Sequence, residues 1–123
     1  MHRNQDWWIA CLCADWCGVC RDWRPAFEAQ AQAHAHPDLR FAWIDVEDEA
    51  DAMGDLDIET FPSLLVARGR QPLFLGPILP SSPGFARLLA SLRAQPQAAA
   101  GLPDAAGPLL QRLLPEVLPR SLV

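Results

Sequence analysis

Apolar runs alternate along the chain with stretches of helical periodicity. Residues 7–14 are almost wholly apolar, which is typical of a strand covered on both faces. From residue 17 the apolar positions recur at spacings of three and four until the polar segment 34–38, which predicts an amphipathic helix. Residues 39–46 are again apolar on both faces, so a second buried strand is expected. Strand, helix and strand in this order predict a right-handed βαβ unit.

A hairpin and a further helix complete the predicted core. Residues 47–58 are mostly acidic with a few apolar positions, which indicates a short irregular helix. The apolar segments 61–68 and 71–78 are separated by a Gly-Arg pair, which predicts a hairpin with a tight turn. Residues 82–94 carry one apolar stripe, and we expect a helix there with Ser82 as its N-cap.

The composition changes after Gln95. Five of the twelve prolines lie beyond it, and the Ala-, Pro- and Gly-rich residues 96–108 predict a linker. The leucine-rich residues that follow form an apolar stripe around Pro115, which breaks or kinks a helix. We expect a short helix that packs back on the same domain, with a partner-binding tail as the alternative. The predicted organisation is a domain over residues 1–95 and a tail over residues 96–123.

The length and the net charge of the chain limit the classes of protein to which it can belong. A chain of 123 residues, half of them apolar, can bury one core. Its ten basic residues are all arginine, and fifteen acids bring the formal net charge to -5, which argues against nucleic acid as a partner. No apolar run is long enough to span a membrane. The start of the sequence lacks the features of a secretory leader, so we expect a cytoplasmic protein, or a periplasmic one if a leader was removed.

The four cysteines of the chain fall within ten residues, at positions 11, 13, 17 and 20. Cysteines so close together cannot tie distant segments to each other, and such clusters are typical of metal-binding or catalytic sites. A four-thiolate zinc site is the weaker interpretation, because structural zinc sites generally join two separate knuckles. These four thiols would instead lie across the end of a strand and the start of a helix, so we expect no metal.

The motif Trp-Cys-Gly-Val-Cys between strand and helix, together with Thr-Phe-Pro-Ser before a later strand, resembles the thioredoxin family over about residues 7–94. Trp16, Pro25 and Pro62 match that family's pattern at their positions. The resemblance implies an α/β thioredoxin-like fold of three layers around a central mixed β-sheet. The family's first strand and helix are missing from the predicted order. We expect the C-terminal helical tail, through residues 108–118, to fill part of that gap.

Chemistry is expected at Cys17 and Cys20. The strand delivers Cys17 to the first turn of a helix, where unpaired N–H groups favour an anion, and the thiolate is the nucleophilic form of cysteine. The resemblance implies that Cys17 attacks a substrate disulfide and that Cys20, one turn deeper, resolves the mixed disulfide and leaves a Cys17–Cys20 bond. It thus implies a thiol-disulfide oxidoreductase without a cofactor. Its partners would be protein disulfide substrates and an unidentified thiol or reductase donor, and we expect a monomer.

Five residues are expected to form the substrate surface beside the thiols: Trp16, Gly18, Val19, Phe61 and Pro62. Trp16 precedes the nucleophile and is expected to be exposed. In the family the proline that matches Pro62 is cis, and Phe61 would then offer main-chain hydrogen bonds to an extended substrate. The family's usual proline is replaced by Val19, which offers neither a proton nor a charge, so a reductive function is favoured.

Two cysteines replace residues that are usual in the family. Cys11 takes the place of a buried aspartate, and Cys13 that of a tryptophan; Asp15 and Glu59 are the acids nearest in sequence that could substitute. We expect Cys11 and Cys13 to be small buried hydrophobes, with Cys11 as a third reactive thiol in the alternative hypothesis. The missing acid also leaves open a thioredoxin-like binding or assembly module with little turnover. A disulfide reduction assay separates that module from the enzyme.

Overall fold

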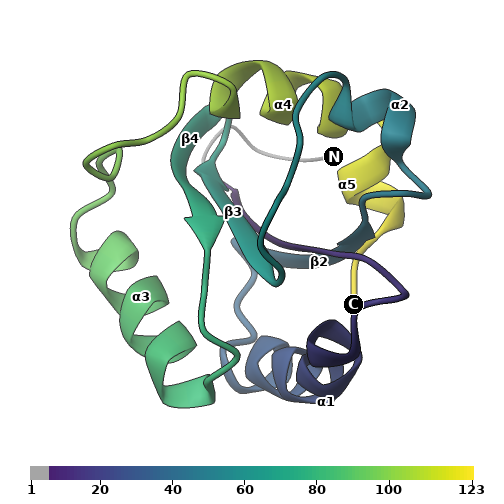
Figure 1. The fold of residues 1–123 in the computed structure, drawn as a ribbon. Coiled ribbons are helices and arrows are strands. Elements are labelled where there is room, and N and C mark those ends of the chain that lie inside the picture. The colour runs from purple at the N-terminus through teal and green to yellow at the C-terminus, as the bar shows by residue number, and fades with distance from the viewer. Residues whose placement is uncertain (1–5) are drawn as a thin grey trace.

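The computed structural model describes residues 6–123, which form a four-stranded mixed sheet with helices on both faces (Figure 1). The strands lie in the order β2-β1-β3-β4. Their bounds are β1 Trp7–Cys13, β2 Leu39–Asp45, β3 Ser63–Arg68 and β4 Gln71–Pro77. Strand β1 pairs parallel with β2 and antiparallel with β3, and β3 pairs antiparallel with β4. The predicted βαβ unit and hairpin are both confirmed.

Helices cover both faces of this sheet and complete the three layers. Their bounds are α1 Gly18–Ala33, α2 Ala50–Met53, α3 Ser82–Ala94, α4 Ala106–Leu113 and α5 Val117–Arg120. Helices α1 and α3 lie on one side, and α2, α4 and α5 lie on the other (Figure 1). No helix in the described part of the chain is both long enough and apolar enough to cross a bilayer.

Strand β1 is buried at all seven of its residues, because helices cover both of its faces. Trp7, Ile9, Cys11 and Cys13 face the layer of α1 and α3, which we call the lower core. Trp8 and the other even-numbered residues face the layer of α4 and α5, which we call the upper core. The alternation predicted for this strand is therefore confirmed, and it places two cysteines in the lower core.

The C-terminal tail is part of the domain core. Three leucines of α4 and one of α5 have no exposed surface, and they pack in the upper core: Leu109, Leu110, Leu113 and Leu118. Helix α4 ends before Pro115 and α5 begins after it, as that proline predicts. The predicted linker 96–108 is too long, because the helix begins at Ala106.

Hydrogen bonds also fix the tail to the rest of the domain. Arg112 of α4 donates hydrogen bonds to the backbone oxygens of Ala52 and Met53, at 2.6 and 3.0 Å, and so binds the end of α2. The last residues pair with the outer edge of β2, where the Trp43 N–H donates to the Ser121 carbonyl at 3.1 Å. Part of an otherwise open sheet edge is thereby satisfied.

The start of α3 corrects one prediction. The N-cap is Ser81, whose backbone is extended (φ −130°, ψ 120°) and whose Oγ accepts a hydrogen bond from the Gly84 N–H at 3.3 Å. Ser82, the predicted cap, is already the first helical residue. Two adjacent serines precede the same apolar stripe, so the pattern could not distinguish them.

Candidate active site

Cys17 lies where the chain passes from the sheet into α1. It is the N-cap of that helix (φ −84°, ψ 112°), and its side chain makes no capping hydrogen bond. Its N–H donates to the Ala14 carbonyl at 3.0 Å, which closes the turn after β1. The sulfur is therefore held beside the first N–H groups at the positive end of a sixteen-residue helix. Cys17 is partly exposed, whereas the other three cysteines are buried.

The disulfide in the structure joins Cys13 to Cys20, and Cys17 and Cys11 are free thiols. The Cα atoms of the bonded pair are 5.9 Å apart, a usual separation for a disulfide. The expectation that Cys13 is only a small buried hydrophobe is wrong. The reason is its place at the end of β1 on the face that α1 covers, because Cys20 points into that same lower core. The disulfide uses two of the four sulfurs that the alternative zinc site would need.

Cys11 lies two residues before Cys13, on the same face of β1. Its Sγ is 3.8 Å from the Cys13 Sγ, and its side chain has no exposed surface. Burial raises the pKa of the Cys11 thiol to about 12, and the nearby Trp23 indole opposes this only in part. Within residues 6–123, the buried Trp23 N–H finds no hydrogen-bond partner of good geometry. Cys11 is thus a protonated thiol at neutral pH, and a reactive role for it stays a prediction.

The predicted substrate residues lie next to Cys17 in the sequence or at the cis proline before β3. The Phe61–Pro62 peptide bond is cis, as the resemblance implies. Trp16 is 64% exposed, and its ring meets that of Phe61 edge to face with 5.7 Å between centroids. Gly18 and Val19 follow Cys17 in the first turn of α1 and are both exposed. Exposed apolar area therefore lies next to the free thiol, and its role in binding substrate stays a prediction.

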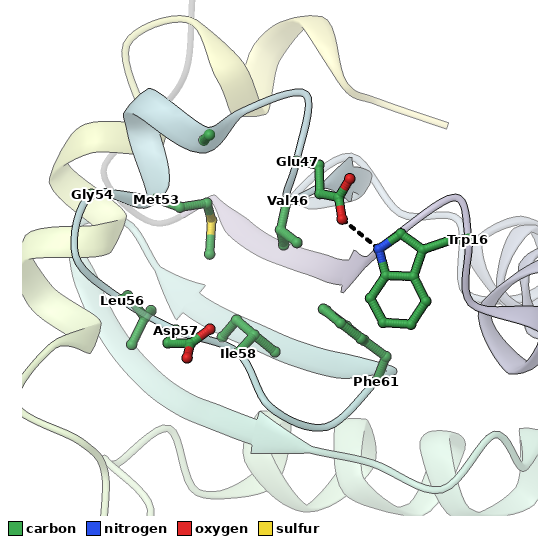
Figure 2. Close-up of a pocket in the computed structure, with 10 residues that line it drawn as sticks. Trp16, Val46, Glu47, Met53, Gly54, Leu56, Asp57, Ile58 and Phe61 are labelled. Carbon is green, nitrogen blue, oxygen red and sulfur yellow. Dashed lines mark hydrogen bonds between the residues drawn. The ribbon is translucent and has the colours of Figure 1, made fainter.

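A cavity of about 250 Å³ opens next to Trp16 and Phe61 (Figure 2). The Trp16 indole N–H donates to the Glu47 carboxylate at its rim, as Figure 2 shows. The rest of its wall comes from the segment between β2 and the cis proline, and includes Val46, Met53, Leu56, Asp57 and Ile58. The sequence pattern predicted a short irregular helix over residues 47–58 and gave no indication of a cavity. The signal that could have found the cavity is its set of apolar residues spaced among the acids.

Asp45 holds together the two loops that border this site. Its carboxylate accepts hydrogen bonds from the backbone N–H groups of Asp15, Glu47 and Asp48, at 3.0, 2.8 and 3.2 Å. Burial raises the pKa of Asp45, but these donors lower it by more, and the net shift is downward. A hydrogen bond and the negative charge of Asp45 raise the pKa of Asp15. The loop before Cys17 is therefore tied to the loop that begins the cavity wall.

Residues 2–74 of the sequence match the thioredoxin family, which is more than half of the 123 residues. The chain belongs to the thioredoxin family. It is 33% identical over 64 residues to a putative thioredoxin 2 of Streptomyces coelicolor, which covers 52% of this chain and 46% of that protein. A thioredoxin of Alicyclobacillus acidocaldarius is 31% identical over 68 residues, or 55% of this chain and 59% of that one. The chain thus spans about half of the length of these curated relatives.

Solved structures show the same thioredoxin-like fold. Mitochondrial thioredoxin 3 of Saccharomyces cerevisiae, in its oxidised form, superposes with a TM-score of 0.60 at 23% identity, covering 72% of this chain and 80% of that chain. Human ERp44 superposes with a TM-score of 0.64 at 21% identity, over 76% of this chain and 29% of that chain. At these identities the likeness shows the α/β fold and assigns no residue a role.

The buried aspartate that the family resemblance implies near the cysteines is absent, and Cys11 stands in its place. Among residues 6–123 the only buried carboxyl group is that of Asp6, which lies at the opposite end of β1 from Cys13 and is 3.4 Å from Arg40. Asp15 and Glu59, the two acids that could substitute in sequence, are both exposed. The lower core around the cysteines is therefore apolar, and any thiolate formed there carries a high desolvation cost.

Proposed function

We propose that this thioredoxin-family protein is a thiol-disulfide oxidoreductase that reduces disulfides of protein substrates through Cys17 and Cys20. The observation that carries the proposal is the position of Cys17, the one partly exposed cysteine of the four, at the N-terminus of α1. A thiolate gains there from the helix N–H groups. Cys20 lies one turn deeper in the same helix, where substrate cannot reach it directly.

The reaction proceeds by two exchanges. The Cys17 thiolate attacks one sulfur of the substrate disulfide, a Cys17–substrate bond forms, and the second substrate sulfur leaves as a thiolate that takes up a proton. Cys20 then attacks the Cys17 Sγ, the substrate's first sulfur leaves with the proton that Cys20 gives up, and a Cys17–Cys20 disulfide remains. Two electrons have passed to the substrate. A thiol or reductase partner returns them, and no cofactor is needed.

The surface around Cys17 supports a protein substrate. Trp16, Val19 and Phe61 present apolar area next to the sulfur, and Pro62 places the Phe61 backbone at the edge of β3. An extended segment of the substrate would bind along this backbone. Glu47 and Asp57 give the adjoining cavity a negative rim, so basic or neutral substrate segments are favoured over acidic ones. We place the activity in a monomer and in a reducing compartment such as the cytoplasm.

A second candidate is a thioredoxin-like binding module with little turnover. The pairing of Cys20 with Cys13 favours it, because Cys20 is then not available to resolve a mixed disulfide at Cys17. In that case Cys17 would retain a bound partner and release it only slowly.

Reduction of insulin disulfides, with dithiothreitol as the electron donor, tests the proposal. We expect the wild-type protein to accelerate insulin precipitation and Cys17→Ser to remain at the rate of dithiothreitol alone. Cys11→Ala is the matched control, because it changes a buried cysteine of β1 that forms no disulfide in the structure. A wild-type protein that binds a disulfide peptide but gives no turnover would instead support the binding module.

A further inference from the structure

Cys20 has two sulfur partners within the fold. Cys17 precedes it by three residues across the first turn of α1, and Cys13 is bonded to it from the end of β1. Building on the proposed function, we propose that Cys13 is a third redox-active cysteine, to which Cys20 passes its bond after the substrate has left. The oxidised protein then stores its disulfide inside the core and presents Cys17 as a free thiol.

The Cys13–Cys20 and Cys17–Cys20 disulfides differ in how accessible their sulfurs are to an external thiol. Cys13 and Cys20 are each 1% exposed, so no external thiol reaches either sulfur of the bond between them. Cys17 is partly exposed and packs on the same lower core. It is therefore the route by which electrons enter: the Cys17 thiolate attacks the Cys20 Sγ before any donor can act.

The transfer is an isomerisation and needs no outside oxidant or reductant. The Cys13 thiolate attacks the Cys20 Sγ, the Cys13–Cys20 bond forms, and the Cys17–Cys20 bond breaks. The electron pair of the broken bond stays on the Cys17 sulfur, which leaves as a thiolate. The leaving group is well placed, because the N–H groups at the start of α1 favour its negative charge. The proton that Cys13 gives up is the one that Cys17 takes up when it is neutralised.

Cys11 is not the acceptor in this exchange. It lies two residues from Cys13 on one strand, and their sulfurs are 3.8 Å apart without a bond. A strand does not bring its i and i+2 side chains into disulfide geometry without distortion. Cys11 is buried in the same layer as Cys13 but forms no disulfide in the structure, so it serves as the matched control for Cys13.

After this exchange, the oxidised protein presents a single accessible thiol, that of Cys17. Its Cys17 can still attack a substrate disulfide, but Cys20 is occupied, so the mixed disulfide persists until Cys20 is released. The reduced protein, with Cys20 free, resolves the same intermediate at once. The Cys13–Cys20 disulfide therefore switches the protein between turning over its substrate and holding it.

Oxidation with diamide, which reaches the partly exposed Cys17, tests the inference directly. We expect the oxidised wild type to keep Cys17 as a thiol that alkylates without denaturation, as located by mass spectrometry. In Cys13→Ala the bond cannot pass beyond Cys20, so we expect a Cys17–Cys20 disulfide and no label on Cys17. The control Cys11→Ala should behave as the wild type. An oxidised wild type whose Cys17 resists alkylation as fully as it does in Cys13→Ala would overturn the proposal.

The unmodified protein gives a second measurement that does not depend on how well a variant folds. Cleavage after Trp16 separates Cys13 from the peptide that holds Cys17 and Cys20. If the oxidised wild type was alkylated before digestion, we expect these two peptides to be linked and Cys17 to carry the label. A Cys17–Cys20 linkage alone would reject the inference. If the stored form exceeds the other by about tenfold, Cys13→Ala raises the reduction potential by about 30 mV.

The two proposals fail in different ways. Insulin reduction by the wild type together with a Cys17–Cys20 linkage alone would remove the role of Cys13 and leave the oxidoreductase. Insulin reduction that survives in Cys17→Ser would remove the oxidoreductase mechanism, while disulfide mapping would still decide the partner of Cys20.

Discussion

Leu110→Ala is the sharpest test of whether the tail belongs to the core. Leu110 lies in α4 with no exposed surface, packed in the upper core against the face of β1 that carries Trp8. A buried leucine replaced by alanine costs about 2–5 kcal/mol, through lost burial and the cavity that remains. At about 0.05–0.15 kcal/mol per residue, a chain of 123 residues has a stability of roughly 6–18 kcal/mol. The substitution should therefore remove a large fraction of it.

Urea unfolding followed by tryptophan fluorescence, together with a thermal melt, measures this loss. We expect a lower urea midpoint with an unchanged slope, and a melting temperature lower by roughly 10–20 °C for a loss of about 3 kcal/mol. Leu79→Ala is the matched control, since Leu79 is 79% exposed and should change stability by less than about 0.5 kcal/mol. Truncation after Gln95 should have a larger effect than Leu110→Ala. Equal stabilities for Leu110→Ala and Leu79→Ala would show that the tail does not pack as described.

Two further predictions concern the surface and the loops of the site. Trp16→Ala should raise the KM for a disulfide-containing protein substrate by about 3–10-fold, because it removes an exposed aromatic side chain from the proposed substrate surface, at a cost of about 1 kcal/mol. The kcat should change little, and Trp16→Phe should keep most of the affinity. Folding lowers the pKa of Asp45, so the ionised carboxylate stabilises the folded protein at every pH above the ordinary aspartate pKa near 3.9. This stabilisation is lost as the pH falls through the lower pKa that Asp45 has in the folded protein. Asp45→Asn should therefore be less stable than the wild type at pH 7 and should lose less stability on acidification. NMR titration of the variant should show the pKa of Asp15 falling toward its usual value, because the charge of Asp45 no longer raises it.

Much of the fold could be predicted because strong local patterns coincide with elements that are buried. Residues 7–13 are apolar on both faces and form the central strand, and Gly69 in the hairpin turn has a positive φ of 61°. The break at Pro115 follows from the missing N–H of proline. Where two neighbouring residues could serve equally, as with Ser81 and Ser82, the pattern carried no information about which one caps the helix.

The candidate site was predicted less completely, for a reason specific to Cys13. Cys17 and Cys20 stand in a recognisable spacing within one helical turn, whereas Cys13 and Cys20 are seven residues apart across a strand, a turn and a helix start. No periodicity links such positions, and only the packing of α1 on β1 brings them together. The cavity beside Trp16 was missed in the same way, because its walls come from separate loops.

In the apolar lower core, a disulfide has a lower desolvation cost than a thiolate does. A thioredoxin-like site that keeps a buried acid has a base to take the proton of its resolving thiol, and here that position is Cys11, which stays protonated. Without such a base, a free thiolate at Cys20 or Cys13 would bear its desolvation cost in an apolar layer. A disulfide carries no charge and bears none of that cost. In the proposed mechanism, the absence of a buried acid slows resolution by Cys20 and so favours its bond to Cys13. On that proposal, the missing acid and the extra cysteine act together on the redox chemistry of this site.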